Sequence, residues 1–344
     1  MAYRAMISGV EQTISVEDGE TLLSAALGAG IAYPHGCRSG RCGSCKTQLL
    51  DGQVDLLPHT PFSLTEAEKQ QGLILACRAR PSSDVAVRWL ARPAASHPVV
   101  RTTAVVRAVE PLTHDIVEIR LKPEQPLAAS PGQFARLYFR GLPARDYSFA
   151  PTADGEVAFH VRVIAGGEVS PAIAGRTRPG LRVTIEGPYG EAYLREDHTG
   201  PMLCVAGGSG LAPILSIVNR AVSARMHQPI HMYFGARDTG DIYGVEQLSR
   251  LAAKHPRLTM HIVLSATRAP GPHRSGFVHQ AIAGDLSGSK RGWKAYVAGP
   301  PAMVDAVDAL CREHGMKPGD FHADPFFTPS ALSASLGSEH EFTR

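Results

Sequence analysis

Four cysteines carry the most specific chemistry that this sequence offers. Cys37, Cys42 and Cys45 lie within nine residues, and Cys77 follows after a long gap. The spacing C-x4-C-x2-C…C is the plant-type pattern for a [2Fe–2S] cluster. Because two thiolates must reach each iron, one tight loop supplies three ligands and a separate segment supplies the fourth. The sequence therefore predicts an iron–sulfur centre ligated by these four residues.

Small residues around these cysteines favour the same interpretation. Ser39, Gly40, Gly43 and Ser44 allow backbone N–H groups to approach the cluster sulfurs, which offsets negative charge and helps to set a potential typically about −400 mV. Structural zinc is the alternative, but zinc sites usually pair C-x2-C with a second close pair, whereas Cys77 stands alone. We expect the two other cysteines, Cys204 and Cys311, to pack as small hydrophobic residues.

The bulk properties are those of an ordinary soluble protein. The chain has 344 residues, 44% apolar and 19% charged, which predicts two or three domains with ample cores. A net charge of +3 is too small to indicate nucleic acid or an anionic membrane as a partner. Residues 1–9 lack the features of a signal peptide, and the most apolar stretch, Met202 to Val218, is interrupted by glycines and Pro213. We expect a cytoplasmic monomer with no membrane partner and no disulfides.

Local patterns predict three domains and a tail. Residues 1–92 are typical of a small mixed α/β domain, with a hairpin at 3–16, helices at 21–29 and after a Ser63-x-x-Glu66 capping box, and strands near 46–50 and 73–76. Residues 91–98 are predicted to form a linker. Alternating apolar residues over 99–196 predict an antiparallel barrel of about six strands. Strands and helices that alternate over 197–327 predict a doubly wound parallel sheet, and 328–344 a flexible tail.

In the predicted barrel, Arg145-Asp146-Tyr147-Ser148 fits the needs of a flavin. The guanidinium suits a pyrophosphate, the aromatic ring can cover the flavin ring, and the hydroxyl can face N5. The alternative is a solvated arginine beside a core tyrosine. Downstream, Gly166, Gly167 and Ser170 lie where a strand leads into a short helix, which predicts a pyrophosphate cradle. We expect His160 to be an ordinary strand residue.

Two glycine-containing turns follow strands of the predicted parallel sheet. The first holds Gly207, Gly208 and Gly210 and departs from G-x-G-x-x-G, although it still opens a helix. By itself it is equally consistent with a tight connection between a strand and a helix. Gly299 and Pro300 begin the second turn at the end of a later strand. Two such turns at one edge of the sheet predict a ligand there.

Taken together, these motifs resemble the ferredoxin–NAD(P)H reductase superfamily with a plant-type ferredoxin domain at the N-terminus. The greatest similarity is to reductases of bacterial aromatic-ring dioxygenases of the naphthalene dioxygenase type, over residues 1 to about 327. The stretches 193–195, 198–205 and 210–213 carry it most clearly. The resemblance implies a β-grasp ferredoxin domain, a barrel that binds FAD and a doubly wound domain that binds NADH, with NADPH also considered.

The resemblance also implies roles for single residues. Arg145, Tyr147 and Ser148 match the flavin motif, with Tyr147 stacked on the flavin and Ser148 facing N5. Asp324 and Phe326 resemble the C-terminal acidic–aromatic element near the flavin, so Ser148 and Phe326 are the expected catalytic positions. Two departures are Ala298, where many relatives have cysteine, and Asp146, where the family has proline. Asp146 could weaken the hold of Arg145 on phosphate.

Electron counting gives the expected function. A nicotinamide gives two electrons as a hydride and a [2Fe–2S] cluster accepts one, so a flavin must stand between them. By resemblance, the final acceptor is a Rieske-type ferredoxin or a terminal oxygenase. The alternatives are the same chain feeding another oxygenase or a deoxysugar dehydratase, or a redox-sensing protein with an inactive flavin site. Arg237 would favour NADPH, and Asp238 and Asp241 would favour NADH, so both remain open, with NADH preferred by resemblance.

Basic residues flank the ligand cysteines and could contact such an acceptor. They are Arg38, Arg41, Lys46, Arg78 and Arg80. One hypothesis is a docking face for an acidic partner, and the other is a solvated edge that offsets the charge of the cluster.

Overall fold

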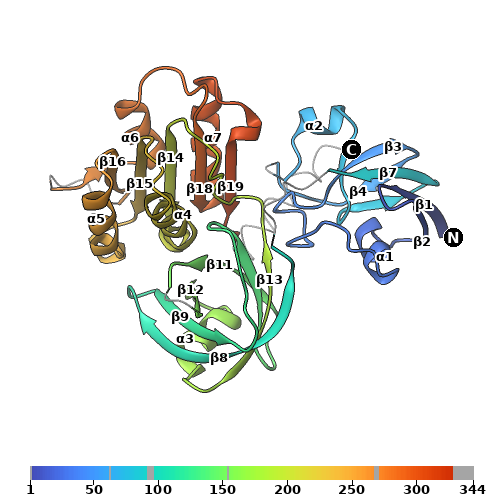
Figure 1. The fold of residues 1–344 in the computed structure, drawn as a ribbon, viewed down its shortest axis with the longest axis horizontal. Coiled ribbons are helices and arrows are strands. Elements are labelled where there is room, and N and C mark those ends of the chain that lie inside the picture. Colours follow the sequence, from blue (N-terminus) through green and yellow to red (C-terminus); the bar gives the residue numbers. More distant parts are fainter. Residues whose placement is uncertain (1, 62, 91–96, 153–154, 267–270, 328–344) are drawn as a thin grey trace. The chain divides into compact units, whose positions relative to one another are not determined.

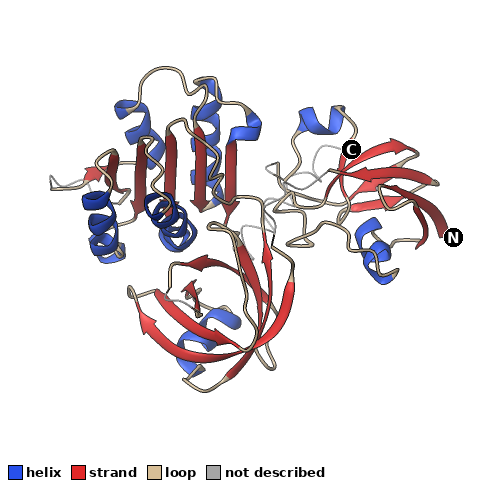
Figure 2. Ribbon diagram, viewed as in Figure 1, coloured by secondary structure: helices blue, strands red, loops and turns tan. Residues whose placement is uncertain are grey.

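The computed structural model describes residues 2–61, 63–90, 97–152, 155–266 and 271–327. These residues form two compact units (Figures 1 and 2). The first holds residues up to 90 with 189–191 and 327, and the second holds 97–188 and 192–326. The predicted tail, 328–344, and residues 91–96 of the predicted linker lie outside the described residues. Among the described helices, none combines the length and the apolar character that crossing a membrane requires.

The first unit is built on a five-stranded sheet in the order β2-β1-β7-β3-β5. Strands β1 and β7 are parallel, and the other neighbours are antiparallel. Helix α1 buries Leu22, Leu23, Ala25 and Ala26 in the core of this unit. The elements are β1 (Ala2–Ser8), β2 (Gln12–Glu17), α1 (Leu22–Gly28), β3 (Lys46–Asp51), β4 (Val54–Leu56), α2 (Glu66–Gln70), β5 (Leu73–Leu75), β6 (Ala79–Pro81) and β7 (Val85–Trp89). Strands β4 and β6 form a separate antiparallel pair.

The capping box of α2 differs from the prediction. It is formed by Thr65 and Glu68, with Glu68 N donating to Thr65 Oγ1 at 3.3 Å and Thr65 N donating to the Glu68 carboxylate at 2.8 Å. Ser63 cannot cap the helix because its hydroxyl is engaged with the carbonyl oxygens of Gly40 and Thr60, at 2.7 and 2.8 Å. Two overlapping S/T-x-x-E patterns were present, and the contact of Ser63 with the cysteine loop decides between them.

A closed six-stranded barrel begins the second unit, in the order β10-β11-β12-β9-β8-β13, which confirms the predicted strand number. Val157, Phe159 and Val161 pack inside the barrel with Phe149, so the alternate residues of the same strand face outward. The elements are β8 (Val100–Pro111), β9 (Ile116–Pro123), β10 (Phe134–Tyr138), β11 (Arg145–Ala150), β12 (Val157–Arg162), α3 (Val169–Arg176) and β13 (Arg182–Tyr189).

A six-stranded parallel sheet completes the second unit, in the order β17-β16-β15-β14-β18-β19. Figure 1 shows α4 and α5 on one face and α6 and α7 on the other. The strands are β14 (Met202–Gly207), β15 (Ile230–Ala236), β16 (Leu258–Leu264), β17 (Arg274–Ser275), β18 (Lys294–Gly299) and β19 (Phe321–Pro325). The helices are α4 (Leu211–Ser223), α5 (Val245–Lys254), α6 (Val278–Asp285) and α7 (Pro301–Glu313), with short turns η1 (Gly208–Gly210), η2 (Thr239–Asp241) and η3 (Pro318–Asp320).

This strand order predicts a ligand-binding crevice at the carboxyl ends of β14 and β18. The chain runs outward from β14 through β15 and β16, then returns to place β18 on the other side of β14. Successive connections therefore leave in opposite directions from β14 and β18. In open parallel sheets, ligands bind outside the carboxyl ends of the strands at such a reversal. Those ends are the positions of the two predicted glycine turns.

Candidate functional site

The four predicted ligand cysteines lie close together in the first unit. Cys37, Cys42 and Cys45 belong to the loop between α1 and β3, and Cys77 lies between β5 and β6. Cys45 Sγ and Cys77 Sγ are 3.3 Å apart, well beyond the roughly 2.05 Å of a disulfide bond. All six cysteines of the chain are free thiols. Four converging thiols that form no disulfide fit a [2Fe–2S] cluster.

Hydrogen bonds favour the thiolate form at Cys37. The backbone N–H groups of Ser39 and Arg41 donate to Cys37 Sγ at 3.5 and 3.2 Å. The pKa of Cys37 lies well below its ordinary value, first because of the hydrogen bond with the Cys42 thiol and then because of the polar groups of Ser39 and Arg41. Thiolates are the form in which cysteine binds iron, so these hydrogen bonds suit Cys37 to its predicted role as a ligand.

The basic residues around this loop are not equivalent. Lys46 Nζ lies 2.5 Å from a carboxylate oxygen of Glu68, so its charge is largely offset. Arg41 Nε donates to Ser39 Oγ at 2.8 Å and Arg38 lies 3.0 Å from His35 Nε2. Arg80 is exposed on β6. Because Lys46 is paired, a docking face would depend on the arginines.

Strand β11 carries the predicted flavin residues. Arg145 is exposed, Tyr147 is half-buried and Ser148 is buried. Asp146 lies opposite Arg136 in the pairing of β10 with β11 and forms two hydrogen bonds with its guanidinium, at 2.8 and 3.1 Å. The charge of Asp146 is therefore partly offset by Arg136, which limits the expected disturbance of Arg145.

Ser148 joins the barrel to the parallel sheet. Its hydroxyl donates to Asp324 Oδ2 at 2.6 Å across 176 residues of sequence. Asp324 reaches this position because β19 pairs with β18, with Asp324 opposite Ala298. Phe326 follows directly, and its backbone N–H donates to Gly299 O at 2.8 Å. The structure therefore brings the predicted residues Ser148, Asp324, Phe326 and Gly299 into one connected region.

The predicted pyrophosphate segment leads into α3. Gly166 has a positive φ of 73° and helix α3 begins at Val169. Ser170 is buried within the first turn of this helix, and its hydroxyl accepts a hydrogen bond from Ile164 N at 3.0 Å. This bond closes the turn that contains Gly166 and Gly167. Backbone N–H groups at the start of a helix can bind phosphate, so the segment fits the predicted role.

Close packing against the second turn and β18 explains the glycines Gly207 and Gly210. A Cβ on Gly207 would lie 2.8 Å from Pro300 Cδ and Met303 Sδ, and one on Gly210 would lie 2.1 Å from Ala298 O. Pro300 caps α7, which begins at Pro301. The two predicted turns therefore touch each other, and Gly210 is required by packing against β18.

We expect Gly210→Ala to destabilise the protein by about 3 kcal/mol, because the new methyl group would overlap the Ala298 carbonyl. Thermal unfolding followed by circular dichroism would measure the change. Gly284→Ala in α6 is the matched control, since a Cβ there meets nothing within 4 Å. A Gly210→Ala variant as stable as the control would show that this approach is not required.

The residues predicted to select the nicotinamide nucleotide lie after β15. Arg237 forms hydrogen bonds with both carboxylate oxygens of Asp241, at 2.6 Å each, and with Asp115 at 3.0 Å. The Arg237 guanidinium, through its hydrogen bond, lowers the pKa of buried Asp241. Asp238 is exposed and accepts from Gly240 N at 2.8 Å. Arg237 and Asp241 therefore engage each other, whereas Asp238 faces solvent.

Two residues near the crevice were not predicted as site residues. Arg162 Nη1 would lie 3.2 Å from a Cβ on Gly208, and its guanidinium is held by Asp115 at 3.0 Å. Phe277 is 58% exposed immediately before α6, where Gly276 N donates to Leu264 O at the carboxyl end of β16. Arg162 could have been found from strand alternation, which places it on the outward face of an apolar strand. Phe277 had no comparable local signal.

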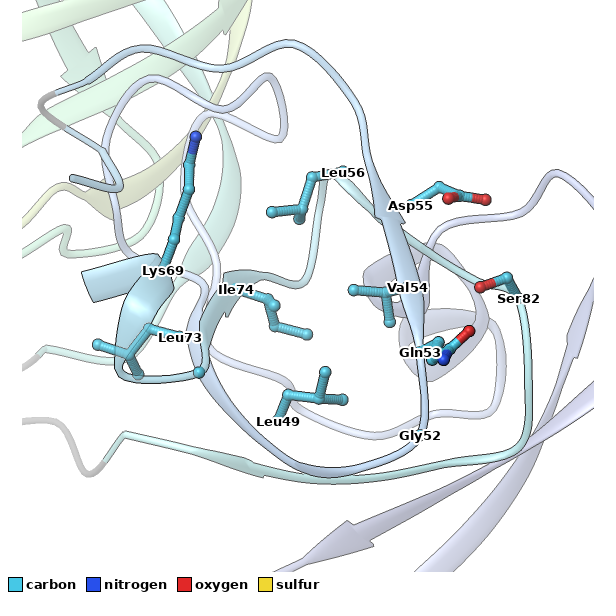
Figure 3. Close-up of a pocket in the computed structure, with 11 residues that line it drawn as sticks. Leu49, Gly52, Gln53, Val54, Asp55, Leu56, Lys69, Leu73, Ile74 and Ser82 are labelled. Atoms are coloured by element: carbon cyan, nitrogen blue, oxygen red, sulfur yellow. The ribbon is translucent and has the colours of Figure 1, made fainter. Parts of the chain in front are cut away.

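An open groove of about 410 Å³ lies in the first unit (Figure 3). Figure 3 shows Leu49, Val54, Leu56 and Ile74 around a common space, with Lys69 at the rim. The lining residues come from β3, β4, α2 and β5 and from the loops beside them. None of them is a predicted cofactor residue, so the groove is separate from the cysteine loop.

Three domain families match the chain. Residues 5–82 match the 2Fe-2S iron-sulfur cluster binding domain, 103–193 the oxidoreductase FAD-binding domain, and 204–309 the oxidoreductase NAD-binding domain. These matches confirm the predicted fold classes and the three cofactors, namely a [2Fe–2S] cluster, FAD and NAD(H).

Known proteins match over nearly the whole chain. The reductase component of the naphthalene 1,2-dioxygenase/salicylate 5-hydroxylase systems of Ralstonia sp is 39% identical, over 93% of this chain and 97% of the relative. The naphthalene 1,2-dioxygenase reductase component of Pseudomonas putida is 38% identical, over 94% and 98%.

Solved structures give the same result. A cytochrome P450 reductase from Amycolatopsis matches with a TM-score of 0.76 and 34% identity, over 94% of this chain and 98% of that one. The ferredoxin reductase of a carbazole 1,9a-dioxygenase matches with a TM-score of 0.70 and 28% identity, over 95% and 99%. With its three domains in this order, the chain belongs to the family of iron–sulfur flavoprotein ferredoxin–NAD(P)+ reductases that serve as reductase components of oxygenase systems.

Proposed function

We propose that this reductase passes electrons from NADH, through FAD and a [2Fe–2S] cluster, to a Rieske-type ferredoxin or terminal oxygenase that hydroxylates aromatic rings. The observation that carries this proposal is the convergence of four free thiols in a chain that also holds flavin and nicotinamide domains. When bound, FAD takes up two electrons as a hydride and releases them one at a time. We propose that the protein acts in the cytoplasm as a monomer.

The barrel residues would bind and orient FAD. The exposed guanidinium of Arg145 and the turn at Gly166, Gly167 and Ser170 would hold the pyrophosphate. The ring of Tyr147 would stack on the flavin. The Ser148 hydroxyl donates its single proton to Asp324, so its oxygen would be the atom that faces N5, and Phe326 would cover the ring and exclude water.

The crevice between β14 and β18 would bind the nicotinamide nucleotide. Its pyrophosphate would lie over the turn that contains Gly207, Gly208 and Gly210, with Gly299 and Pro300 forming the adjoining wall and Arg162 supplying positive charge. Arg237 is engaged by two carboxylates, so it is poorly placed to bind a 2′-phosphate. Asp238 is exposed and could accept from a ribose hydroxyl. These features support NADH over NADPH.

We also propose that Phe277 supports the adenine ring. We expect Phe277→Ala to raise the KM for NADH about 5-fold at an unchanged maximal rate, because one aromatic face is lost from binding alone. Steady-state reduction of ferricyanide would measure both constants. Leu181→Ala, which removes an exposed side chain from a turn of the barrel, is the control. An unchanged KM for NADH in Phe277→Ala would show that Phe277 does not contact the adenine ring.

The nature of the acceptor rests on similarity. The relatives include reductases of a naphthalene dioxygenase system, a phenol 2-monooxygenase and an aromatic O-demethylase. We propose an acidic iron–sulfur or oxygenase partner that contacts the arginines near the cysteine loop. A chain that feeds another oxygenase or a deoxysugar dehydratase would use the same residues. A redox sensor with an inactive flavin site is less well supported, because Asp146 pairs with Arg136.

An anaerobic titration of the purified protein with NADH tests the proposal. We expect the flavin and iron–sulfur absorption bands to bleach within a few equivalents, followed by reoxidation on addition of a Rieske-type ferredoxin. Bands that persist with NADH but bleach with NADPH would reverse the preferred nucleotide. Bands that persist with both would exclude the proposed electron path.

A further inference from the structure

A line of polar contacts links the barrel to the first glycine turn. His160 on β12 is 9% exposed, and its Nδ1 lies 3.1 Å from the hydroxyl of Tyr243. Tyr243 lies between η2 and α5 and is 7% exposed. Its hydroxyl donates to Gly208 O at 3.3 Å, so the ring nitrogen of His160 is the donor to the tyrosine oxygen. Buried polar groups are costly unless they are paired, and here each group meets another.

The neighbours of the two rings fix their orientation. Glu118 lies opposite His160 in the pairing of β9 with β12. The ring of Tyr243 meets that of His160 at 68° and that of Phe234 at 90°. Burial raises the pKa of Tyr243, so its hydroxyl keeps the proton that it donates. The hydroxyl therefore has one well-defined direction.

Gly208 is the residue whose orientation this contact controls. It has a φ of 56°, and its carbonyl also accepts from Leu211 N in the first turn of the helix. In a trans peptide the carbonyl and the following N–H point in opposite directions. Anchoring Gly208 O on Tyr243 therefore directs the N–H of Ser209 away from that side and fixes the peptide planes of the turn.

The same contacts reach the flavin region. Phe149 faces Phe159 in the pairing of β11 with β12, which places His160 beside Ser148 on the neighbouring strand. Both lie on the outward face of the barrel, where Ala150 and Ala158 pack against Ala212 of α4. His160 is therefore next to the residue expected to face N5 and, through Tyr243, in contact with the expected pyrophosphate turn.

We propose that His160 and Tyr243 are positioning residues that hold the Gly207–Gly210 turn in the conformation that binds the pyrophosphate of NADH. This inference rests on the proposed function. Neither side chain is assigned to touch the nucleotide, so both act through the Gly208 carbonyl. If the two residues only packed against their neighbours, removing the Tyr243 hydroxyl would not change the affinity for the nucleotide. The effect of a substitution at Tyr243 would also not depend on the residue at position 160.

Tyr243→Phe tests the inference with the loss of a single oxygen atom and retention of both ring contacts. We expect the KM for NADH and the Kd for NAD+ to rise about 10-fold, as for the loss of one buried hydrogen bond. At saturating NADH, the rate constant for flavin bleaching in a stopped-flow experiment should remain within about 3-fold of wild type. The control is Tyr233→Phe, which removes the hydroxyl that donates to Asp285 at 2.9 Å on the α6 side of the sheet.

Substitutions at His160 complete a double-mutant cycle. His160→Leu should raise the KM for NADH, whereas His160→Asn, whose amide can replace Nδ1, should restore it toward wild type. The double variant combines His160→Leu with Tyr243→Phe. Its KM for NADH should rise no further than in the more affected single variant, because both substitutions interrupt the same line of contacts.

Three results would overturn the inference. They are an unchanged KM in Tyr243→Phe, strictly additive effects in the cycle, or equal losses of rate, FAD content and thermal stability in all the variants. A wild-type protein whose flavin is not reduced by NADH would instead contradict the proposed function, and the two failures are therefore distinguishable.

Discussion

Cys77→Ala should abolish the iron–sulfur absorption bands and reduce electron transfer to a ferredoxin-type acceptor by about 100-fold or more. Cys77 is the single predicted ligand outside the loop at 37–45, and its sulfur lies 3.3 Å from that of Cys45. Without it, one iron lacks a thiolate and the one-electron path ends at the flavin. Reduction of ferricyanide by NADH, which a flavin can support directly, should persist. Visible absorption, electron paramagnetic resonance and acceptor assays would measure these effects.

Cys311→Ala provides the matched control. Cys311 is buried in α7 of the parallel-sheet domain, outside the predicted ligand set, and burial raises the pKa of its thiol to about 12. The control should retain both cofactors and full acceptor reduction. Intact iron–sulfur bands in Cys77→Ala would refute the proposed ligand set. Loss of ferricyanide reduction together with the cluster would indicate that the variant had lost its fold.

Ser148→Ala should slow flavin reduction by NADH about 100-fold at saturating nucleotide. The hydroxyl is fixed by Asp324 at 2.6 Å, so it is held in one direction before the nucleotide binds. Its loss removes the group expected to face N5 and leaves the Asp324 carboxylate without that donor. The Kd for NAD+ should change by less than about 3-fold, because Ser148 lies outside the proposed pyrophosphate turn. Anaerobic stopped-flow absorbance would give both values.

Ser216→Ala separates this effect from a general weakening of the unit. Ser216 Oγ on α4 donates to Phe149 O at 2.7 Å, so it also links the parallel sheet domain to the barrel, at the neighbouring residue of β11. We expect removal of the Ser216 hydroxyl to leave the rate constant for flavin reduction by NADH within about 3-fold of wild type. Comparable losses in both variants would mean that the contact between barrel and sheet, and not the hydroxyl at 148, is what matters.

The fold was predictable from local patterns, because each domain has its own periodicity. Alternation on β12 indicated the barrel, and buried strands followed by helices indicated the parallel sheet. The predicted capping box was wrong because the choice between Ser63 and Thr65 depends on a contact of Ser63 with Gly40, which lies 23 residues earlier in the sequence. A contact between residues so far apart in the sequence cannot be predicted from local sequence patterns.

For the candidate site, the local motifs could be predicted from the sequence but the long-range contacts could not. The cysteine spacing and the short motifs around Ser148 and Gly207 were visible because their residues are close in the sequence. The roles expected for them remain predictions. The contact of His160 with Tyr243 was missed, since the two residues are separated by 83 positions and a single histidine in an apolar strand carries no signal of its partner. The pairing of Asp146 with Arg136 was likewise hidden, because it depends on strand register.

The place of β19 at the far end of the sequence has a consequence for synthesis on the ribosome. Asp324 is translated 176 residues after Ser148, a delay of roughly 10–35 s at typical elongation rates. The cysteines are complete much earlier, and domains generally fold in the order in which they emerge. A nascent or prematurely terminated chain can therefore acquire its metal centre while the electron entry point is still unfinished. Truncated products of this chain should be iron-loaded yet unable to draw electrons from a nicotinamide.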